Sequence, residues 1–173
     1  NEYGPMEVSG YMNVEIVGPI DRILSIYPDD PTQISNFSLF NASRSTYAKF
    51  SLNYLHISGF VSNRDGAVLY AAKDIQTKID INPSYDTLLR FTAESLVIQN
   101  VHATGHGGAF IIRHCLDCYI KGSTFINVTA EQGGSIYFKT YNTRFHIMNT
   151  SFIRSHASVD GGAIYVQQSN EDF

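Results

Sequence analysis

The chain has 173 residues and a formal net charge of −4, with 12 Lys and Arg against 16 Asp and Glu. The length suits one domain with a hydrophobic core, and the acidic balance argues against the basic face of a nucleic-acid-binding protein. Thirteen Gly, eleven Tyr, eleven Phe and no Trp favour a β-rich protein. No apolar run is long enough to span a bilayer as a helix. The start at Asn1 without Met predicts a processed product or a fragment.

The first part of the chain, residues 1–50, lacks the glycine motif found later. Its segments 14–16 and 23–27 look like strands, and a turn with two prolines, residues 28–31, comes directly after them. Repetitive β-structures need terminal caps that block exposed strand edges. We therefore expect residues 1–50 to form an N-terminal cap or arm, or an atypical first coil, and residues 51–173 to form the repeats.

A glycine motif repeats through the second part of the chain. Residues 133–137 (Gly-Gly-Ser-Ile-Tyr) return as residues 161–165 (Gly-Gly-Ala-Ile-Tyr), and residues 107–110 and 65–68 are similar. The expected turn glycines are Gly66, Gly107, Gly108, Gly133, Gly134, Gly161 and Gly162. Counted from Gly66, Gly108, Gly134 and Gly162, the periods are 42, 26 and 28 residues. Internal repeats of this size predict supersecondary units that stack on one another.

A second block precedes each glycine turn and contains two apolar residues five positions apart. The four blocks are 55–60, 96–101, 120–125 and 147–152. Side chains alternate between faces along a strand, so an odd spacing needs a corner or bulge between the two residues. We expect corners near residues 58–59, 122–123 and 149–150. Strand, corner, strand, turn and strand within 24 to 28 residues predict an all-β fold, a parallel β-helix; a β-sandwich is the alternative, but sandwiches do not repeat their sequence in this way.

Alternation also predicts which side chains face the core after each glycine turn. Two columns are expected to point inward, namely Val68, Phe110, Ile136, Ile164 and Tyr70, Ile112, Phe138, Val166. The column between them, Leu69, Ile111, Tyr137, Tyr165, is then expected to point outward. Tyr137 and Tyr165 would form an outer contact stripe for a partner, unless another part of the chain covers them or they lie in solvent.

The long first period indicates an insertion at about residues 71–94, with its tip at residues 82–86. Insertions in repeat proteins form loops on one face and are often where binding occurs.

Two cysteines, Cys115 and Cys118, are the only ones in the chain. A redox pair would need a βαβ context, and a metal site would need a second pair of ligands. A local disulfide in an oxidising compartment is the favoured interpretation.

Four sequons mark Asn36, Asn41, Asn127 and Asn149 as glycosylation sites if the protein is secreted by a eukaryote. Asn127 follows the inward Phe125, and Asn149 lies at an expected corner, so both side chains are expected to be exposed.

No catalytic or metal-binding motif is present, and no cofactor is expected. The carboxylates nearest the turns, Asp65, Glu131 and Asp160, do not share one column, so the repeat does not pair them for acid–base chemistry. His102 and His106 are four residues apart, a spacing without meaning outside a helix. The histidines, including His114, His146 and His156, are expected to be exposed in turns.

The segment 125–137, with its Phe-Ile-Asn element before Gly-Gly-Ser-Ile-Tyr, resembles the repeats of polymorphic outer membrane proteins. Residues 152–165 match with one extra residue, and residues 95–112 and 55–70 match more loosely. The resemblance implies right-handed parallel β-helices exposed at cell surfaces, in adhesive or structural roles. The chain departs from that family where Arg154 replaces the expected Asn, and no C-terminal membrane barrel is seen.

These observations predict a non-enzymatic extracellular or cell-surface module, structural or adhesive, that assembles end to end into a filament or surface layer. We expect self-association through the ends, or a glycan or cell-surface partner. We expect neither a membrane span nor binding to nucleic acid. The alternatives are a polysaccharide lyase or hydrolase, which would need paired carboxylates on neighbouring coils, and a glycan-binding module.

Overall fold

A computed structural model describes residues 6–19, 24–30, 32–72, 89–139 and 142–167, with residues 6–14, 43–48 and 72 described by their backbone alone. Within these ranges the chain forms strands, turns and bends and no helix. The strands are β1 (Met6–Val17), β2 (Leu24–Ile26), β3 (Ile34–Ser35), β4 (Phe40–Asn53), β5 (Leu55–Ser58), β6 (Val61–Ser62), β7 (Leu69–Ala72), β8 (Leu89–Glu94), β9 (Val97–Ala103), β10 (Phe110–Arg113), β11 (Cys115–Lys121), β12 (Thr124–Gln132), β13 (Ile136–Phe138), β14 (Phe145–Met148), β15 (Ser151–Ile153), β16 (His156–Asp160) and β17 (Ile164–Val166).

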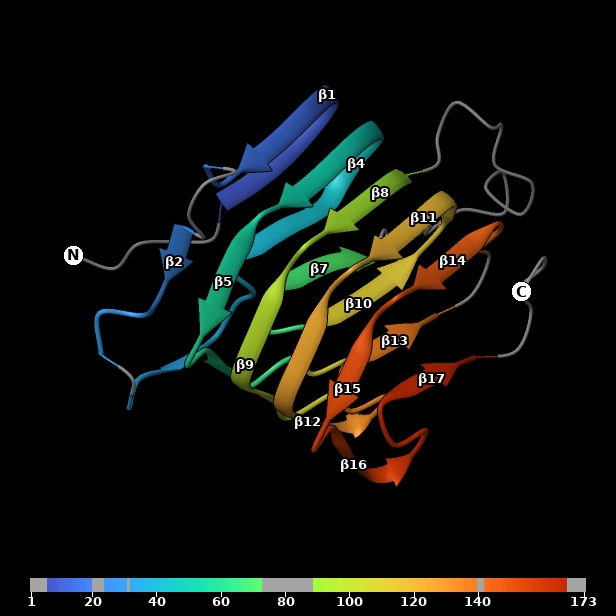
Figure 1. The fold of residues 1–173 in the computed structure, drawn as a ribbon. Coiled ribbons are helices and arrows are strands. Elements are labelled where there is room, and N and C mark those ends of the chain that lie inside the picture. The colour runs from blue at the N-terminus through green and yellow to red at the C-terminus, as the bar shows by residue number, and fades with distance from the viewer. Residues whose placement is uncertain (1–5, 20–23, 31, 73–88, 140–141, 168–173) are drawn as a thin grey trace.

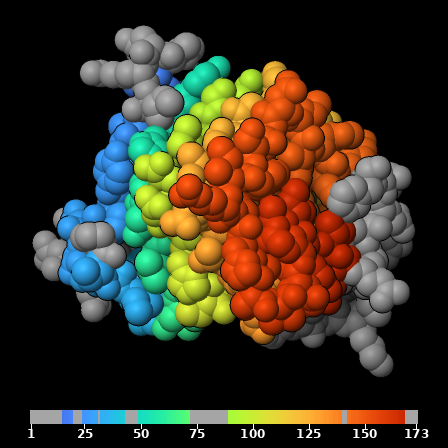
Figure 2. All heavy atoms as spheres, turned by 60° about the horizontal axis from the view of Figure 1, so that its bottom comes forward, coloured from blue at the N-terminus to red at the C-terminus, as the bar shows by residue number. Residues whose placement is uncertain are grey.

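All strand pairings in the described part of the chain are parallel. One sheet has the order β14-β11-β8-β4-β7-β10-β13-β17, with β1 on β4, and the other has the order β15-β12-β9-β5-β2, with β3, β6 and β16 beside it. Figure 1 shows each strand beside the equivalent strand of the preceding and following stretch of chain. We call such a stretch a pass; Val97 and Thr124, for example, are opposite each other one pass apart. In Figure 2 the passes form successive bands of colour across the molecule.

The strands turn at corners where the backbone has a positive φ. One column of corner residues has φ values of 48° to 57° and comprises Tyr54, Ser95, Gly122 and Asn149. A second column has φ values of 52° to 79° and comprises Gly59, Asn100, Asn127 and Arg154. The corners predicted near residues 58–59, 122–123 and 149–150 are therefore confirmed. Gly, Asn and Ser suit these places because they tolerate left-handed backbone conformations better than most residues.

The four apolar blocks do not occupy one column, which differs from the expectation based on the sequence. Ile120 is opposite Ala93, and Phe125 is opposite Ile98, which is opposite Ile57. The blocks at 55–60 and 96–101 span the corner at Gly59 and Asn100, whereas the later two span the corner at Gly122 and Asn149. Both corners place an inward residue on either side, so the same five-residue spacing arises at each.

The register after the first glycine turn also differs from the prediction. Leu69, not Val68, is opposite Phe110, so Gly66 is equivalent to Gly107 and the first period is 41 residues. The shift by one residue exchanges the two faces of the strand. Leu69 therefore belongs to the core, and Tyr70, predicted to point inward, lies opposite Ile111 on the outer face.

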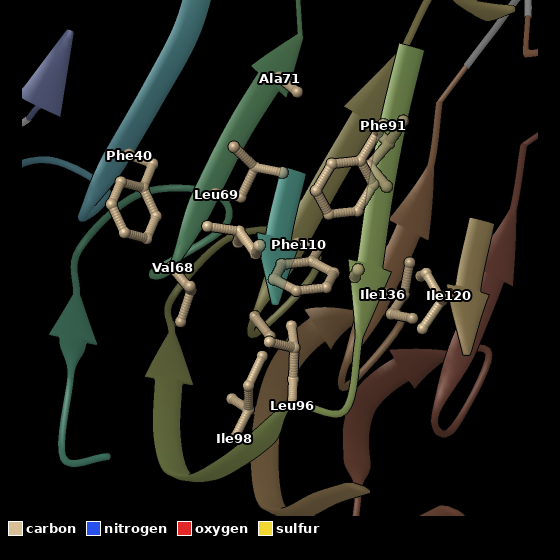
Figure 3. Close-up of a cluster of buried hydrophobic side chains, with 14 of the residues drawn as sticks. Phe40, Val68, Leu69, Ala71, Phe91, Leu96, Ile98, Phe110, Ile120 and Ile136 are labelled. Carbon is tan, nitrogen blue, oxygen red and sulfur yellow. The ribbon is translucent and has the colours of Figure 1, made fainter. Parts of the chain in front are cut away.

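Phenylalanines and aliphatic side chains from different passes fill the core (Figure 3). Phe50 stacks on Phe91 with ring centroids 6.2 Å apart, Phe91 meets Phe110 edge to face at 5.4 Å, and Phe110 meets Phe125 at 5.5 Å. All four are fully buried. Burial of each large apolar side chain contributes about 1.5–3 kcal/mol, so this row is a main source of stability.

The described strands within residues 6–53 belong to the two sheets. β1 lies along β4, β2 places Leu24 opposite Leu55, and β3 pairs with β6. The boundary expected at residue 50 falls inside β4. At the insertion, residues 89–94 form β8 between β4 and β11, while its expected tip at residues 82–86 lies outside the described residues.

Candidate functional site

An outer stripe of side chains runs across β7, β10, β13 and β17, on the opposite face of the sheet from the core. Its members come from successive passes and are Tyr70, Ile111, Tyr137 and Tyr165. Tyr137 and Tyr165 are stacked, with ring centroids 5.3 Å apart and planes 12° apart. The stripe is not open to solvent at its centre, because Ile111 is fully buried and Tyr137 is 4% exposed.

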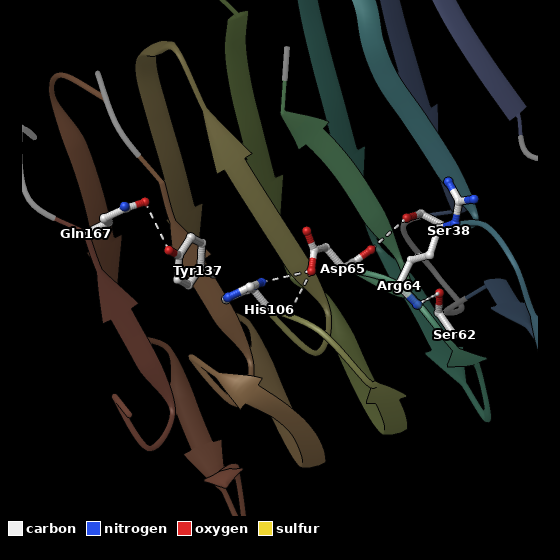
Figure 4. Close-up of polar contacts among 7 residues, drawn as sticks. All are labelled: Ser38, Ser62, Arg64, Asp65, His106, Tyr137 and Gln167. Atoms are coloured by element: carbon white, nitrogen blue, oxygen red, sulfur yellow. Dashed lines mark hydrogen bonds and ion pairs between the residues drawn. The ribbon is translucent and has the colours of Figure 1, made fainter. Parts of the chain in front are cut away.

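A row of polar residues crosses the molecule at Tyr137, with Gln167 on one side of it and His106 and Asp65 on the other (Figure 4). The Tyr137 hydroxyl donates a hydrogen bond of 3.0 Å to Gln167, and its ring packs against His106 at 4.8 Å between centroids. Asp65 accepts hydrogen bonds from His106, and its backbone carbonyl accepts one from Ser38 at 3.2 Å. Burial raises the pKa of Tyr137, and Tyr165 and Asp65 add to that effect. This arrangement ties neighbouring passes together and leaves Tyr137 little surface for a partner.

A second outer feature is a groove over β4, β8 and β11 with a volume of about 190 Å³. We call it the basic groove, and it is lined by Lys49, Arg90, Thr92, Asp117 and Tyr119. Alternation along each strand positions these residues, because their neighbours Phe50, Phe91 and Cys118 fill the core. The sequence analysis did not find the groove. Its residues lie in three strands that share no motif, and only the register brings them together.

Two columns of side chains shape the basic groove. In one, Lys49 is opposite Arg90, and Arg90 is opposite Asp117. Asp117 pairs with Arg144 at 2.9 Å and lies 3.7 Å from Arg90.

In the other column, the small Ser51 and Thr92 are followed by the large Tyr119 and His146. Tyr119 and His146 are stacked at 5.0 Å. The change from small to large side chains makes Tyr119 a wall beside the space over Thr92.

The disulfide between Cys115 and Cys118 lies at the start of β11, under the basic groove. The buried amide of Asn142 holds this region: its Oδ1 accepts from the Cys115 backbone N–H at 3.1 Å, and its Nδ2 donates to the Lys139 carbonyl at 2.9 Å.

The sequon asparagines occupy different environments. Asn36, Asn127 and Asn149 are exposed, whereas Asn41 lies half-buried in β4 opposite Tyr70. Asn127 donates a hydrogen bond of 2.9 Å to Asn100, the equivalent corner residue of the preceding pass. Asn36 accepts one of 2.6 Å from Asn63.

The carboxylates and histidines near the turns are spread over the molecule. Asp160 is opposite Gln132 and accepts its side-chain hydrogen bond at 3.0 Å, while Asp65 lies beside His106. Among the residues that the structure describes, no group of three His, Cys, Asp or Glu side chains is arranged to hold a metal ion. Three of the histidines, His102, His146 and His156, are exposed as expected but lie in β9, β14 and β16 and not in turns. The expectation of exposure is wrong for His114, which is 2% exposed at a corner with φ of 57°.

The two ends of the sheets present strand edges. At the N-terminal end, β2 is the last strand of its sheet, with Leu24 46% exposed. At the C-terminal end, β15 is the last strand of the same sheet, with Ile153 47% exposed. Figure 2 shows the C-terminal passes in orange and red across a broad face.

The described part of the chain contains no helix, and so no helix there is long and apolar enough to cross a membrane. In comparisons with known proteins, no family model, no curated protein and no solved structure matches the chain.

Proposed function

We propose that the chain is a right-handed parallel β-helix that serves as an extracellular structural or adhesive module and assembles end to end. Parallel strands with offsets of one pass, recurring corners with positive φ and a continuous core support the solenoid. Connections between parallel strands of one sheet are right-handed in about 98% of cases, which supports the handedness. The observation that carries the proposal is that β2 and β15 are the two edge strands of one parallel sheet. The strands between them are aligned, so that residues of β2 have equivalent residues on β15.

A second copy of the chain fits these edges. Ile26 is opposite Ile57, and the same column continues through Ile98 and Phe125 to Phe152 on β15. A copy that places its β2 against β15 continues this apolar column and pairs the free backbone groups of both edges. The contact joins unlike ends, so it can repeat without closing and build a filament.

Charges at the two ends also match. Pro28 lies 3.5 Å from the position of a Cβ on Gly59, so it belongs to the corner column that ends at Arg154. Stacking of a second copy therefore brings its Asp29 and Asp30 to the corner at Arg154. Hydrogen bonds from the hydroxyl and backbone N–H of Thr32 hold the pKa of Asp30 below its usual range, which keeps it charged.

Charge exchange tests the assembly, with negative-stain electron microscopy and sedimentation velocity as readouts. Wild-type protein should form filaments or concentration-dependent oligomers. Arg154→Glu alone, and Asp29→Lys with Asp30→Lys alone, should weaken assembly by repulsion, and all three changes in one chain should restore it. Lys121→Gln, which removes a charge away from both edges, is the matched control. A wild-type protein that stays monomeric, or an Arg154→Glu protein that assembles normally, would refute the proposal.

The extracellular location is proposed from the sequons and the disulfide. Disulfides persist mainly in oxidising compartments, and exposed Asn36, Asn127 and Asn149 can accept glycans. Asn127 keeps one N–H for its bond to Asn100 after glycosylation. Glycopeptide mapping of protein secreted from eukaryotic cells should find modification at these three sites and little at half-buried Asn41. Absence of glycan at all three exposed sites would count against the location.

A further inference from the structure

We propose that the basic groove binds an acidic saccharide, with a sugar ring against Tyr119 and its carboxylate between Lys49 and Arg90. The site lies on the side of the sheets and not at their edges, so this inference does not depend on end-to-end assembly.

The first support is a pair of like charges that Asp117 compensates only in part. Lys49 and Arg90 are directly opposite on neighbouring strands, about 4.8 Å apart along the sheet. Like charges at this position are destabilising. Asp117 is engaged more closely by Arg144, at 2.9 Å, than by Arg90, at 3.7 Å. In the described structure, no carboxylate forms an ion pair with Lys49, so an anion bound between the two cations would relieve their repulsion.

The second support is the aromatic wall. Tyr119 is 37% exposed, and His146 stacks on it from the strand beyond. On the side away from His146, Tyr119 is opposite Thr92, whose small side chain leaves space that belongs to the groove. A pyranose ring has an apolar face of C–H groups that packs on an aromatic ring, while its hydroxyl groups bond to polar neighbours such as Thr92.

The size of the groove favours one sugar residue of a longer chain. Its volume of about 190 Å³ is below that of pockets for drug-sized molecules, which have about 300–1,000 Å³. The groove is partly open to solvent, so neighbouring sugars can extend out of it. An acidic peptide would satisfy the two cations but would not use the flat wall of Tyr119, and for that reason we favour the saccharide.

The test is isothermal titration calorimetry of the intact protein with a trimer of β-linked glucuronic acid. The matched ligand control is the same trimer with its carboxyl groups methyl-esterified. We expect the acidic trimer to bind, and the ester to bind at least about tenfold more weakly because charge-assisted hydrogen bonds are lost. Arg90→Gln and Lys49→Gln should each weaken binding of the acid by a similar factor and should leave the weak binding of the ester unchanged.

Two further variants make the result specific. Tyr119→Val should weaken binding of both the acid and the ester, since both use the ring, and Lys121→Gln should change neither because Lys121 pairs with Glu94 outside the groove. All of these side chains are at the surface, and circular dichroism verifies that each variant is folded. No binding of the acidic trimer, equal binding of its ester, or equal binding by Arg90→Gln would overturn the proposal. Tighter binding of oligoglutamate than of the trimer would instead assign the groove to acidic peptides.

Discussion

Asp65 accepts two hydrogen bonds from His106 with one carboxylate oxygen, from the backbone N–H at 2.8 Å and from Nδ1 at 3.0 Å. The two residues are 41 positions apart and belong to neighbouring passes. Asp65 therefore fixes both the backbone and the imidazole of His106, and the imidazole in turn packs against Tyr137. This contact joins the passes on either side of the insertion.

We expect Asp65→Ala to lower the free energy of unfolding by about 1–2 kcal/mol, since two hydrogen bonds to a partly exposed carboxylate are lost. Urea denaturation followed by circular dichroism measures the change. Asp65→Asn retains an oxygen acceptor for the His106 backbone and should cost less than Asp65→Ala. Equal losses for the two variants would mean that the backbone hydrogen bond contributes nothing.

Gly134 has no room for a side chain. A Cβ at this position would collide with the backbone carbonyl oxygens of Gly162 and His156 on the next pass. We expect Gly134→Ala to destabilise the protein by about 2–3 kcal/mol, because backbone atoms of the next pass would have to move. Thermal or urea unfolding would show the loss.

Gly122→Asn is the matched control for Gly134→Ala. Gly122 has a positive φ, but the nearest atom to a Cβ there is 3.8 Å away, and Ser95 and Asn149 adopt the same conformation at equivalent corners. Its stability should stay within about 0.5 kcal/mol of the wild type. A larger loss for Gly122→Asn than for Gly134→Ala would contradict the steric explanation.

Asn142 is fully buried and satisfies the backbone of two segments. Asn142→Ala removes the acceptor for the Cys115 N–H and the donor to the Lys139 carbonyl, and should cost about 2–3 kcal/mol because buried polar groups lose their partners. Asn63→Ala removes one exposed side-chain hydrogen bond and should cost no more than about 0.5 kcal/mol. If chemical denaturation gave similar losses of stability for Asn142→Ala and Asn63→Ala, burial of the hydrogen-bonding groups would not explain the cost.

The raised pKa of Tyr137 predicts that the protein loses stability at alkaline pH. The pKa of this side chain is raised in the folded protein, mainly by burial and to a smaller extent by Tyr165 and Asp65. A tyrosine in the unfolded chain titrates at about pH 10. The folded protein therefore holds this proton when the unfolded chain has lost it. Stability linked to Tyr137 is fully present below about pH 10 and is lost as pH rises through the folded pKa.

Denaturation of the wild type and of Tyr137→Phe at a series of pH values isolates this effect. Tyr137→Phe lacks the titrating hydroxyl and the hydrogen bond to Gln167, so its stability should fall less steeply above about pH 10. Identical slopes for both proteins would show that Tyr137 is not responsible.

Several features of the fold derive from local sequence. The corners at Gly59, Gly122 and Asn149 were predictable because an odd spacing of apolar residues requires a change of face, and these residue types accept positive φ. The position of Tyr70 was not predictable. An Asp-Gly-Ala motif can be aligned with Gly-Gly-Ala in two ways, and a shift of one residue exchanges core and surface.

The all-β character, the repeat of one pass after another, and the alternation that places phenylalanines in a common core were predictable from the amino-acid sequence alone. These are local properties, set by residue type and spacing. The register between passes was decided only by the tertiary structure, because backbone hydrogen bonds between parallel strands do not depend on side-chain identity. Register in turn decided that Lys49 faces Arg90, that Tyr119 stands beside Thr92, and that Asp65 reaches His106. The side chains of both outer faces therefore acquire their neighbours from the stacking of passes.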